Sequence, residues 1–392
     1  MVLVRIPVFG YKRFLLGECM RDTSDPTAPV CSHDEWSPLQ EVIVGTVQGA
    51  MYPECGPILA ANGEPDWLWH FQGEFMEEDV IEQADEQLSH FVELLENHDV
   101  VVKRPDPLPL NQPYSTPYWS SKSSWNTANP RDLFLIVGDD IIECASPMRH
   151  RHFESLAYKR LMTGYFRRGA KLSSAPRPAL REPLYDWSFM ATPEQEAESK
   201  DSKTLPDGAV HRYPITEAEP VFEAADFVRC GTDLFVTKSI VTNDLGIEWV
   251  RRHLPDGYEV HEIHTRCSAP CHIDTTFLPL RPGLAVVNPD WVKELPEALS
   301  SWTLIEAPEP TYHDASPMAH PYFTSQWLSM NVFSLDDKHV FVDAQQKNLM
   351  AAFREHGLVP IPVPFDYVGM FGGSFHCVTL DVRRQGPLGT YR

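Results

Sequence analysis

Short apolar segments and single helices alternate through most of this chain, and this alternation restricts the fold more than any other feature. RDLFLIVGDDIIECA (131–145) contains two apolar runs joined by Gly138, Asp139 and Asp140, a pattern typical of a β-hairpin. EEDVIEQADEQLSHFVELLENH (77–98) has the apolar spacing of an amphipathic helix. A unit of two or three strands and one helix is too small to bury its own apolar face. Several such units are therefore expected to pack around a common axis in an α/β fold.

The rest of the chain continues this order. Further helices are expected at 152–171, 244–254 and 347–357, and further strands at 233–241, 258–264, 275–280, 284–289, 327–335, 339–344 and 358–365. Between 173 and 220 the chain is rich in Pro, Glu, Ser and Lys, and its apolar residues follow neither helical nor strand spacing. This composition predicts a long excursion or loop. The glycine spacings of Rossmann and P-loop motifs do not occur, so no nucleotide cofactor is expected.

The charge of the chain narrows the choice of partners. Its 33 Lys and Arg residues against 55 Asp and Glu residues leave a net charge of −22, which disfavours nucleic acid and anionic membranes and favours a small cationic substrate. No run approaches the roughly 18 apolar residues of a membrane-spanning helix. The stretch 1–18 is interrupted by Arg5, Lys12 and Arg13 and lacks a small-residue cleavage site. We therefore expect a cytoplasmic protein.

The eight cysteines are scattered, unlike the dense cysteines of a secreted disulfide scaffold, so reduced thiols are expected. The one cluster that resembles a metal site is HTRCSAPCH, with His264, Cys267, Cys271 and His272. Its C-x3-C spacing has no second cysteine pair, which is weak support for zinc. The expectation is an enzyme with no metal.

Three acidic or histidine motifs lie at predicted strand ends: NPRD (129–132), FEAAD (222–226) and CHID (271–274). Taken singly, each has a structural explanation, because Asp132 is placed to serve a turn, Glu223 to cap a helix and His272 to be a core histidine. GGSFHCVTLDVRR (372–384) adds a single cysteine beside a strand. Alone, that cysteine is equally a small core residue, a disulfide partner, a metal ligand or a nucleophile.

Taken together, these motifs form a coherent chemical set. A thiolate nucleophile needs a lowered pKa or a base, the base needs an orienting carboxylate, and a guanidinium substrate needs planar carboxylates to accept its hydrogen bonds. Cys377, His272, Glu223, Asp132 and Asp274 supply these groups.

Seven phrases, in order, resemble the arginine:glycine amidinotransferase family of the guanidino-group-modifying (pentein) superfamily. They are EWSPLQEVIVG, PRDLFLIVGDDIIE, FEAADFVRCGTDLF, TNDLGIEWVRRHL, CHIDTTF, WLSMNV and GGSFHCVTLDVRR. The resemblance covers roughly residues 30–385, and the pairing of CHIDTTF with Gly-Gly-x-x-His-Cys is its most specific part. It implies a five-bladed α/β propeller of ββαβ modules without metal or organic cofactor. We expect a single catalytic domain, 31–392, after an N-terminal extension, 1–30.

The resemblance also implies roles for individual residues. Cys377 corresponds to the nucleophile that becomes an amidino-cysteine, His272 to the general acid and base, and Asp132 and Asp274 to guanidinium ligands. Glu223 aligns with the carboxylate that orients the histidine, which is usually Asp in the amidinotransferases and Glu in the resembling hydrolases.

Further substrate-binding residues are expected at Asp226, Trp291, Thr324 and Ser325. The sequence departs from the family at NPDW, where Trp291 replaces an arginine that binds a substrate α-carboxylate. It also departs at Ala269 and Cys271, where the family usually has Asn and Met. A basic side chain such as Arg281 is an alternative source of the missing contact.

The implied function is transfer of the amidino group of L-arginine to an acceptor amine, with release of ornithine. The acceptor is a specialised-metabolite amine or glycine, and a homodimer is an open alternative to a monomer. One rival is an arginine deiminase-like hydrolase that makes citrulline, which Glu223 favours. A rival of another class is a non-catalytic arginine-binding protein, which would not require Cys377, His272 and the carboxylates together.

Overall fold

The computed structural model describes residues 28–63, 66–190, 203–204, 210–292, 294–322 and 324–391, so nearly all of the predicted N-terminal extension lies outside the described residues. The described residues form five three-stranded sheets of one design. In each sheet the middle strand pairs antiparallel with one neighbour and parallel with the other. These sheets confirm the predicted five-bladed α/β propeller of ββαβ modules.

Four modules are continuous in the chain, and a helix or short turn leads into the last strand of each. The modules are β5 (Phe134–Val137), β6 (Asp140–Glu143), α4 (Lys159–Arg167) and β7 (Lys171–Ser174); β10 (Phe227–Cys230), β11 (Asp233–Val236), α6 (Asp244–His253) and β12 (Glu259–Glu262); β13 (Phe277–Arg281), β14 (Leu284–Val287), the 3₁₀ turn Glu297–Leu299 and β15 (Thr303–Glu306); and β16 (Phe333–Ser334), β17 (His339–Asp343), α7 (Lys347–Glu355) and β18 (Val359–Val363).

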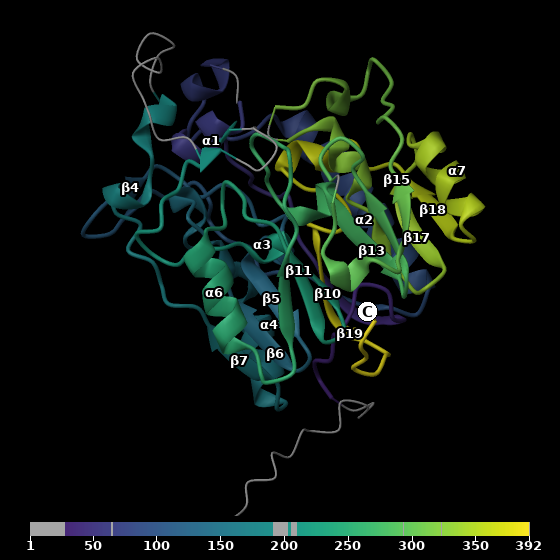
Figure 1. The fold of residues 1–392 in the computed structure, drawn as a ribbon. Coiled ribbons are helices and arrows are strands. Elements are labelled where there is room, and N and C mark those ends of the chain that lie inside the picture. The colour runs from purple at the N-terminus through teal and green to yellow at the C-terminus, as the bar shows by residue number, and fades with distance from the viewer. Residues whose placement is uncertain are drawn as a thin grey trace, which may run out of the picture.

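The remaining module joins the two ends of the described chain. β1 (Leu39–Val44) pairs antiparallel with β19 (Thr379–Arg384), with Val42 opposite Asp381, and parallel with β2 (Val101–Lys103). Figure 1 shows β19 in the middle of the molecule, apart from the yellow α7 and β18 that precede it. Because the last strand supplies the first position of the first module, it closes the ring.

Helix α2 (Glu78–Asn97) lies between β1 and β2 and matches the predicted helix within one residue at each end. Its buried residues Ala84, Leu88, Phe91 and Leu95 follow helical spacing and join the core that surrounds the β1 sheet. The apolar spacing therefore predicted both the element and the face that it buries.

Two predicted elements are wrong in part. The expected helix at 152–171 is helical as α4 only over Lys159–Arg167, because a 3₁₀ segment, Glu154–Tyr158, precedes it. The expected strand at 327–335 pairs only at Phe333–Ser334, since the 3₁₀ turn Gln326–Met330 fills its first half. Both irregular segments turn polar side chains inward, Glu154 in the first case and Ser329 in the second.

Smaller elements connect the modules. They are α1 (Pro57–Ala61), α3 (Pro130–Leu133), β3 (Tyr114–Ser115) paired with β4 (Ser120–Ser121), and β8 (Lys203–Thr204) paired with β9 (Val210–His211). The β8–β9 pair belongs to the predicted excursion at 173–220, of which 191–202 and 205–209 lie outside the described residues. Among the helices of the described residues, none has the length and apolar character needed to cross a membrane.

Candidate active site

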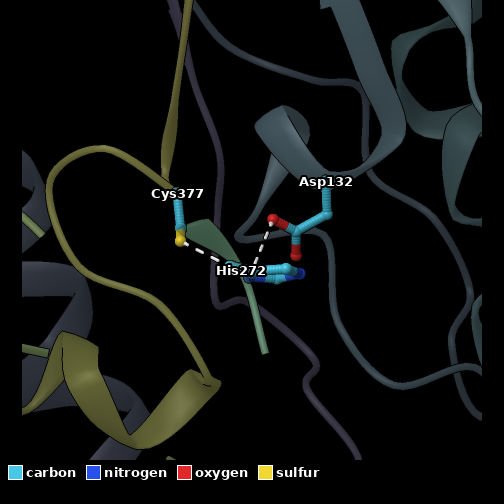
Figure 2. Close-up of side chains that lie close together, drawn as sticks. All are labelled: Asp132, His272 and Cys377. Carbon is cyan, nitrogen blue, oxygen red and sulfur yellow. Dashed lines mark hydrogen bonds and ion pairs between the residues drawn. The ribbon is translucent and has the colours of Figure 1, made fainter. Parts of the chain in front are cut away.

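Six of the predicted site residues share one position in the fold, shortly before the first strand of a module. Asp132 lies in α3 before β5. Glu223 precedes, and Asp226 ends, the 3₁₀ turn Ala224–Asp226 before β10. His272 and Asp274 lie before β13, and Cys377 lies before β19. The modules surround one axis, so the starts of their first strands converge. Residues far apart in the sequence thereby become neighbours, as Figure 2 shows for Asp132, His272 and Cys377.

The cysteine and the histidine face each other at the centre of this arrangement. Cys377 Sγ lies 4.0 Å from His272 Nδ1 and 3.4 Å from Asp274 Oδ2. Both side chains are buried, at 1% and 7% exposure. The separation of sulfur and nitrogen is longer than a strong hydrogen bond, but such contacts are often loose before a substrate binds.

The opposite nitrogen of His272 is held by a carboxylate. His272 Nε2 lies 2.9 Å from Glu223 Oε2, and Ser146 Oγ donates to Glu223 Oε1 at 2.5 Å. His272 also has φ 65° and ψ 139°, a conformation that costs a non-glycine residue about 1–3 kcal/mol. Surrounding contacts thus hold the imidazole with Nδ1 toward the sulfur.

Three buried carboxylates have an oxygen available to a ligand. The Oδ1 atoms of Asp132, Asp226 and Asp274 are buried and accept no hydrogen bond from the described residues. Their Oδ2 atoms are held by Arg151, by Ser239 and Thr242, and by His376, respectively. A planar cation with several N–H donors is the kind of ligand that satisfies such oxygens.

The protonation states follow from burial and neighbouring charges. Burial raises the pKa of Glu223, but Arg151 and His272 outweigh it and bring that pKa down to about 2. Burial opposes the cationic form of His272, yet Cys271, Asp132 and hydrogen bonds to Cys377 and Glu223 hold its pKa well above the usual value. Burial, together with Asp274, raises the pKa of the Cys377 thiol. These shifts favour the imidazolium form of His272, the ionised form of Glu223 and the neutral form of the Cys377 thiol.

Comparison with the sequences of known proteins identifies the family to which this chain belongs. No profile of a known protein family matches the chain. The L-arginine:L-lysine amidinotransferase of Pseudomonas savastanoi pv. phaseolicola is 40% identical over 372 residues, which cover 93% of this chain and 97% of the relative. The mitochondrial glycine amidinotransferase of Gallus gallus is 40% identical over 368 residues, with 93% of this chain and 85% of the relative covered.

The chain belongs to the amidinotransferase family.

A solved structure supports the same assignment. SxtG, an amidinotransferase from Microseira wollei in the saxitoxin biosynthetic pathway, has a TM-score of 0.83 and 41% identity, and the match covers 93% of this chain and 100% of SxtG. The fold, the order of the modules and the overall sequence thus agree with one family of transferases.

Two residues that the sequence did not single out hold the cysteine loop of this amidinotransferase. Asn331, just before β16, donates from Nδ2 to Cys377 Sγ at 3.1 Å, and its Oδ1 accepts from the backbone N–H groups of His376 and Cys377. Arg131 Nε donates to the carbonyl oxygens of His376 and Thr379. The phrases PRD and WLSMNV contained both residues, but no local pattern linked them to the cysteine.

A third residue, Arg151, connects two of the carboxylates. Its NH1 group donates to Asp132 Oδ2 at 2.8 Å and lies 3.2 Å from Glu223 Oε2, while its Nε donates to Glu154. Because a buried cation between two carboxylates offsets their mutual repulsion, Arg151 lets Asp132 and Glu223 lie close together.

The other predicted substrate-binding residues are Trp291, Thr324 and Ser325. Trp291 follows β14, and the centre of its ring lies 6.3 Å from the centre of the Trp327 ring. Trp327 belongs to the 3₁₀ turn Gln326–Met330, and this turn contacts the turn that carries Asp274. Thr324 and Ser325 precede the turn Gln326–Met330 and are partly buried. Within the described part of the chain, no hydrogen bond links these three residues to Cys377 or His272, so their substrate contacts stay a prediction.

The structure also shows what surrounds the other positions at which the sequence differs from the family. Ala269 and Cys271 pack against an apolar cluster that includes Met148. Arg281 donates to the carbonyl oxygen of His356, at the far end of β13 from His272, so replacement of the missing arginine by Arg281 has no support in the structure.

Within the described part of the chain, two groups of side chains have the spacing of metal ligands. Asp132, His272 and Cys377 offer atoms within 4.8 Å of one another, and so do Asp233, Glu259 and His261. The first group is the site described above. In HTRCSAPCH, the segment whose spacing weakly resembled a zinc site, His264 pairs with Glu262 at 3.5 Å, and the described residues show no cluster of metal ligands containing Cys267.

Glycine at position 373 allows the cysteine loop to approach α3. A Cβ atom there would lie 2.5 Å from Cys377 Cβ and 2.4 Å from Asn129 Oδ1. Gly373→Ala is therefore expected to displace Cys377 and lower kcat by about 100-fold, the loss typical of an error of about 1 Å in catalytic geometry. Steady-state kinetics check this, with Gly164→Ala in α4 as the control because its added Cβ meets only Arg168, at 3.6 Å. A Gly373→Ala enzyme with unchanged kcat contradicts the prediction.

Proposed function

We propose that this amidinotransferase moves the amidino group of L-arginine to an acceptor amine through a covalent intermediate on Cys377. L-arginine is the donor named for the Pseudomonas relative. The observation that carries the proposal is the position of Cys377 Sγ, 4.0 Å from His272 Nδ1, beside buried carboxylates whose Oδ1 atoms accept no hydrogen bond from the described residues. We also propose that residues 31–392 act as one catalytic domain.

The first half-reaction begins when the guanidinium group enters among Asp132, Asp226 and Asp274. A cation beside the sulfur lowers the pKa of the Cys377 thiol, whose proton leaves to solvent. The thiolate attacks the guanidinium carbon, and the bond from that carbon to the side-chain nitrogen of arginine breaks. His272 gives its proton to the departing nitrogen, so ornithine leaves and the amidino group stays on sulfur.

The second half-reaction reverses these roles. An acceptor amine enters the space left by ornithine and attacks the amidino carbon, and neutral His272 takes a proton from its nitrogen. The bond from carbon to sulfur breaks, which releases a new guanidine and the thiolate. Glu223 stabilises the imidazolium that forms in this step, as the carboxylate does in other carboxylate–histidine pairs.

The carbon–sulfur intermediate is shared with guanidine hydrolases, in which water takes the place of the amine. Glu223, the residue that favoured hydrolysis in the sequence, makes the same 2.9 Å contact to His272 that an orienting carboxylate requires in either reaction. Identities of 40% and 41% to three amidinotransferases support transfer.

Sequence identity alone does not select the acceptor, because the lysine and glycine enzymes are equally similar to this chain. Trp291 replaces a cationic clamp with an indole, which weakens recognition of a small carboxylate and adds a flat apolar wall. A larger or less anionic amine than glycine is therefore proposed, such as a specialised-metabolite amine.

Incubation with L-arginine and a panel of amines tests the function. Mass spectrometry is expected to detect ornithine in amounts equal to the new guanidine, and glycine is expected to compete poorly with bulkier amines. Formation of citrulline instead of ornithine would identify a hydrolase. If glycine reacts with a kcat/KM above roughly 10⁴ M⁻¹s⁻¹ and bulkier amines do not compete, the argument from Trp291 is wrong.

A further inference from the structure

Asn331 is the polar side chain nearest to the sulfur of Cys377. Three side chains of the described residues make hydrogen-bond contacts with Cys377 Sγ. Asn331 Nδ2 lies at 3.1 Å, Asp274 Oδ2 at 3.4 Å and His272 Nδ1 at 4.0 Å. The mechanism above uses the aspartate and the histidine but gives no role to the amide. Because the Asn331 side chain is fully buried, bulk water does not compete for its contact with the sulfur.

The hydrogen bonds of Asn331 fix which end of its amide faces the sulfur. Its Oδ1 atom accepts from the backbone N–H of His376 at 2.8 Å and from that of Cys377 at 3.2 Å. An amide NH₂ group cannot accept these bonds, so a rotated side chain would lose both of them and direct its oxygen at the sulfur. The group that faces Cys377 Sγ is therefore the N–H donor.

The backbone around Asn331 holds this donor in place. Asn331 directly follows the 3₁₀ turn Gln326–Met330, and its backbone N–H donates to the Leu328 carbonyl oxygen at 3.0 Å. The same turn contacts the 3₁₀ turn Ile273–Thr275, which carries Asp274. The amide is thus fixed relative to both the sulfur and the carboxylate beside it.

The amide acts on the sulfur in the opposite direction to its surroundings. Burial raises the pKa of the Cys377 thiol, and the Asp274 carboxylate adds to this effect. An N–H donor binds a thiolate more strongly than a thiol, and it therefore favours the charged form. Where a thiol pKa lies above the ambient pH, the gain in thiolate outweighs the accompanying loss of intrinsic nucleophilicity. A fixed donor at this position therefore speeds attack by the sulfur.

We propose that Asn331 is a catalytic residue that donates from Nδ2 to the sulfur of Cys377 whenever the sulfur carries negative charge. In the first half-reaction the thiol proton leaves to solvent, and the thiolate accepts from Nδ2 as it attacks the guanidinium carbon. In the second, both electrons of the breaking carbon–sulfur bond go to sulfur, which again accepts from Nδ2. Asn331 gives up no proton in either step. The two steps rest on the proposed function, whereas stabilisation of the thiolate does not.

Alkylation of Cys377 by iodoacetamide at mildly alkaline pH tests the donor without L-arginine, and peptide mass spectrometry measures its rate. Asn331→Asp keeps an oxygen for the two backbone N–H groups, whose bonds favour the ionised carboxylate, and directs a second oxygen without a proton at the sulfur. The rate is expected to fall about 10- to 100-fold, the effect of one hydrogen bond to a charged group. Asn331→Leu, which has no polar atom, is expected to show a similar loss.

Thr379→Val is the matched control for a role limited to holding the cysteine loop. Thr379 Oγ1 donates to the carbonyl oxygens of Phe375 at 2.8 Å and His376 at 3.0 Å and makes no hydrogen bond to the sulfur. A loosened loop admits water, which weakens the effect of burial on the thiol pKa, so this variant is expected to react at the wild-type rate or faster. Wild-type or faster alkylation of Asn331→Asp would overturn the proposal. Equal slowing in Thr379→Val would also overturn it.

Single-turnover release of ornithine from L-arginine is the second readout. It is expected to slow about 10- to 100-fold in Asn331→Asp, in line with the alkylation rate. Wild-type release by Asn331→Asp would contradict the catalytic role. If the wild-type protein releases no ornithine, the proposed function is refuted, and the alkylation rates still decide whether Asn331 stabilises the thiolate. Asn331→Leu leaves two backbone N–H groups unbonded, so circular dichroism checks its folding, and Asn331→Asp decides if it does not fold.

Discussion

Replacing Cys377 with alanine is expected to abolish amidino transfer, with a loss of about 10⁴-fold or more in kcat, because no other group in the site forms the covalent bond to carbon. After mixing with L-arginine, intact-mass measurement of the wild-type protein is expected to show an amidino adduct of about 42 Da, and Cys377→Ala none. The alanine protein is expected to fold, since the substitution removes one sulfur atom from a turn rather than from a strand.

Cys230 provides a matched control for this experiment. Its side chain is also 1% exposed and lies in β10, where it packs in an apolar cluster. Cys230→Ala is expected to lose some stability to the small cavity and to keep both the adduct and the turnover. An adduct on Cys377→Ala, or its absence from Cys230→Ala with normal folding, would contradict the assignment of the nucleophile.

His272→Ala is expected to slow both half-reactions by about 10²- to 10⁴-fold, the range for loss of a positioned acid and base. Single-turnover release of ornithine measures the first half-reaction, and transfer from an isolated amidino-enzyme to the amine measures the second. Glu223→Gln is expected to have a smaller effect on both, because Glu223 acts by holding His272 Nε2 at 2.9 Å and stabilising its charge.

His264→Ala is the matched control for His272, since the side chain of His264 is 76% exposed and pairs only with Glu262 among the carboxylates of the described residues. It is expected to leave both half-reactions unchanged. If His272→Ala releases ornithine at the wild-type rate, the histidine is not the acid of the first step, and Asp226, whose pKa burial raises to about 7, becomes the next candidate.

Much of the local structure was readable from the sequence. The spacing of apolar residues in 77–98 predicted α2 and its buried face, and the two runs around Gly138 predicted the β5–β6 hairpin. These features depend on contacts between residues only a few positions apart, which the periodicity of the chain records. The chemistry-bearing motifs were readable for a related reason, because each occupies a short turn at a strand end.

The sequence could not show which side chains support that chemistry. Asn331 is 46 residues from Cys377 and Arg151 is 72 residues from Glu223, yet each pair is joined by a hydrogen bond. The predicted helix at 152–171 is wrong at its start, where Arg151 and Glu154 form a buried ion pair and Arg151 also bonds to the distant Asp132 and Glu223. A polar residue whose hydrogen-bond partner lies in another module cannot be recognised from the residue pattern of its own segment.

The sequence by itself determined most of the strands and helices, their order along the chain and the chemical groups available for catalysis, because these follow from local spacing and residue type. The tertiary structure decided which oxygens of Asp132, Asp226 and Asp274 accept no hydrogen bond from the described residues, and which nitrogen of His272 faces the sulfur. The physical reason is the closure of the ring: only when β19 pairs with β1 do the starts of the first strands meet on one axis.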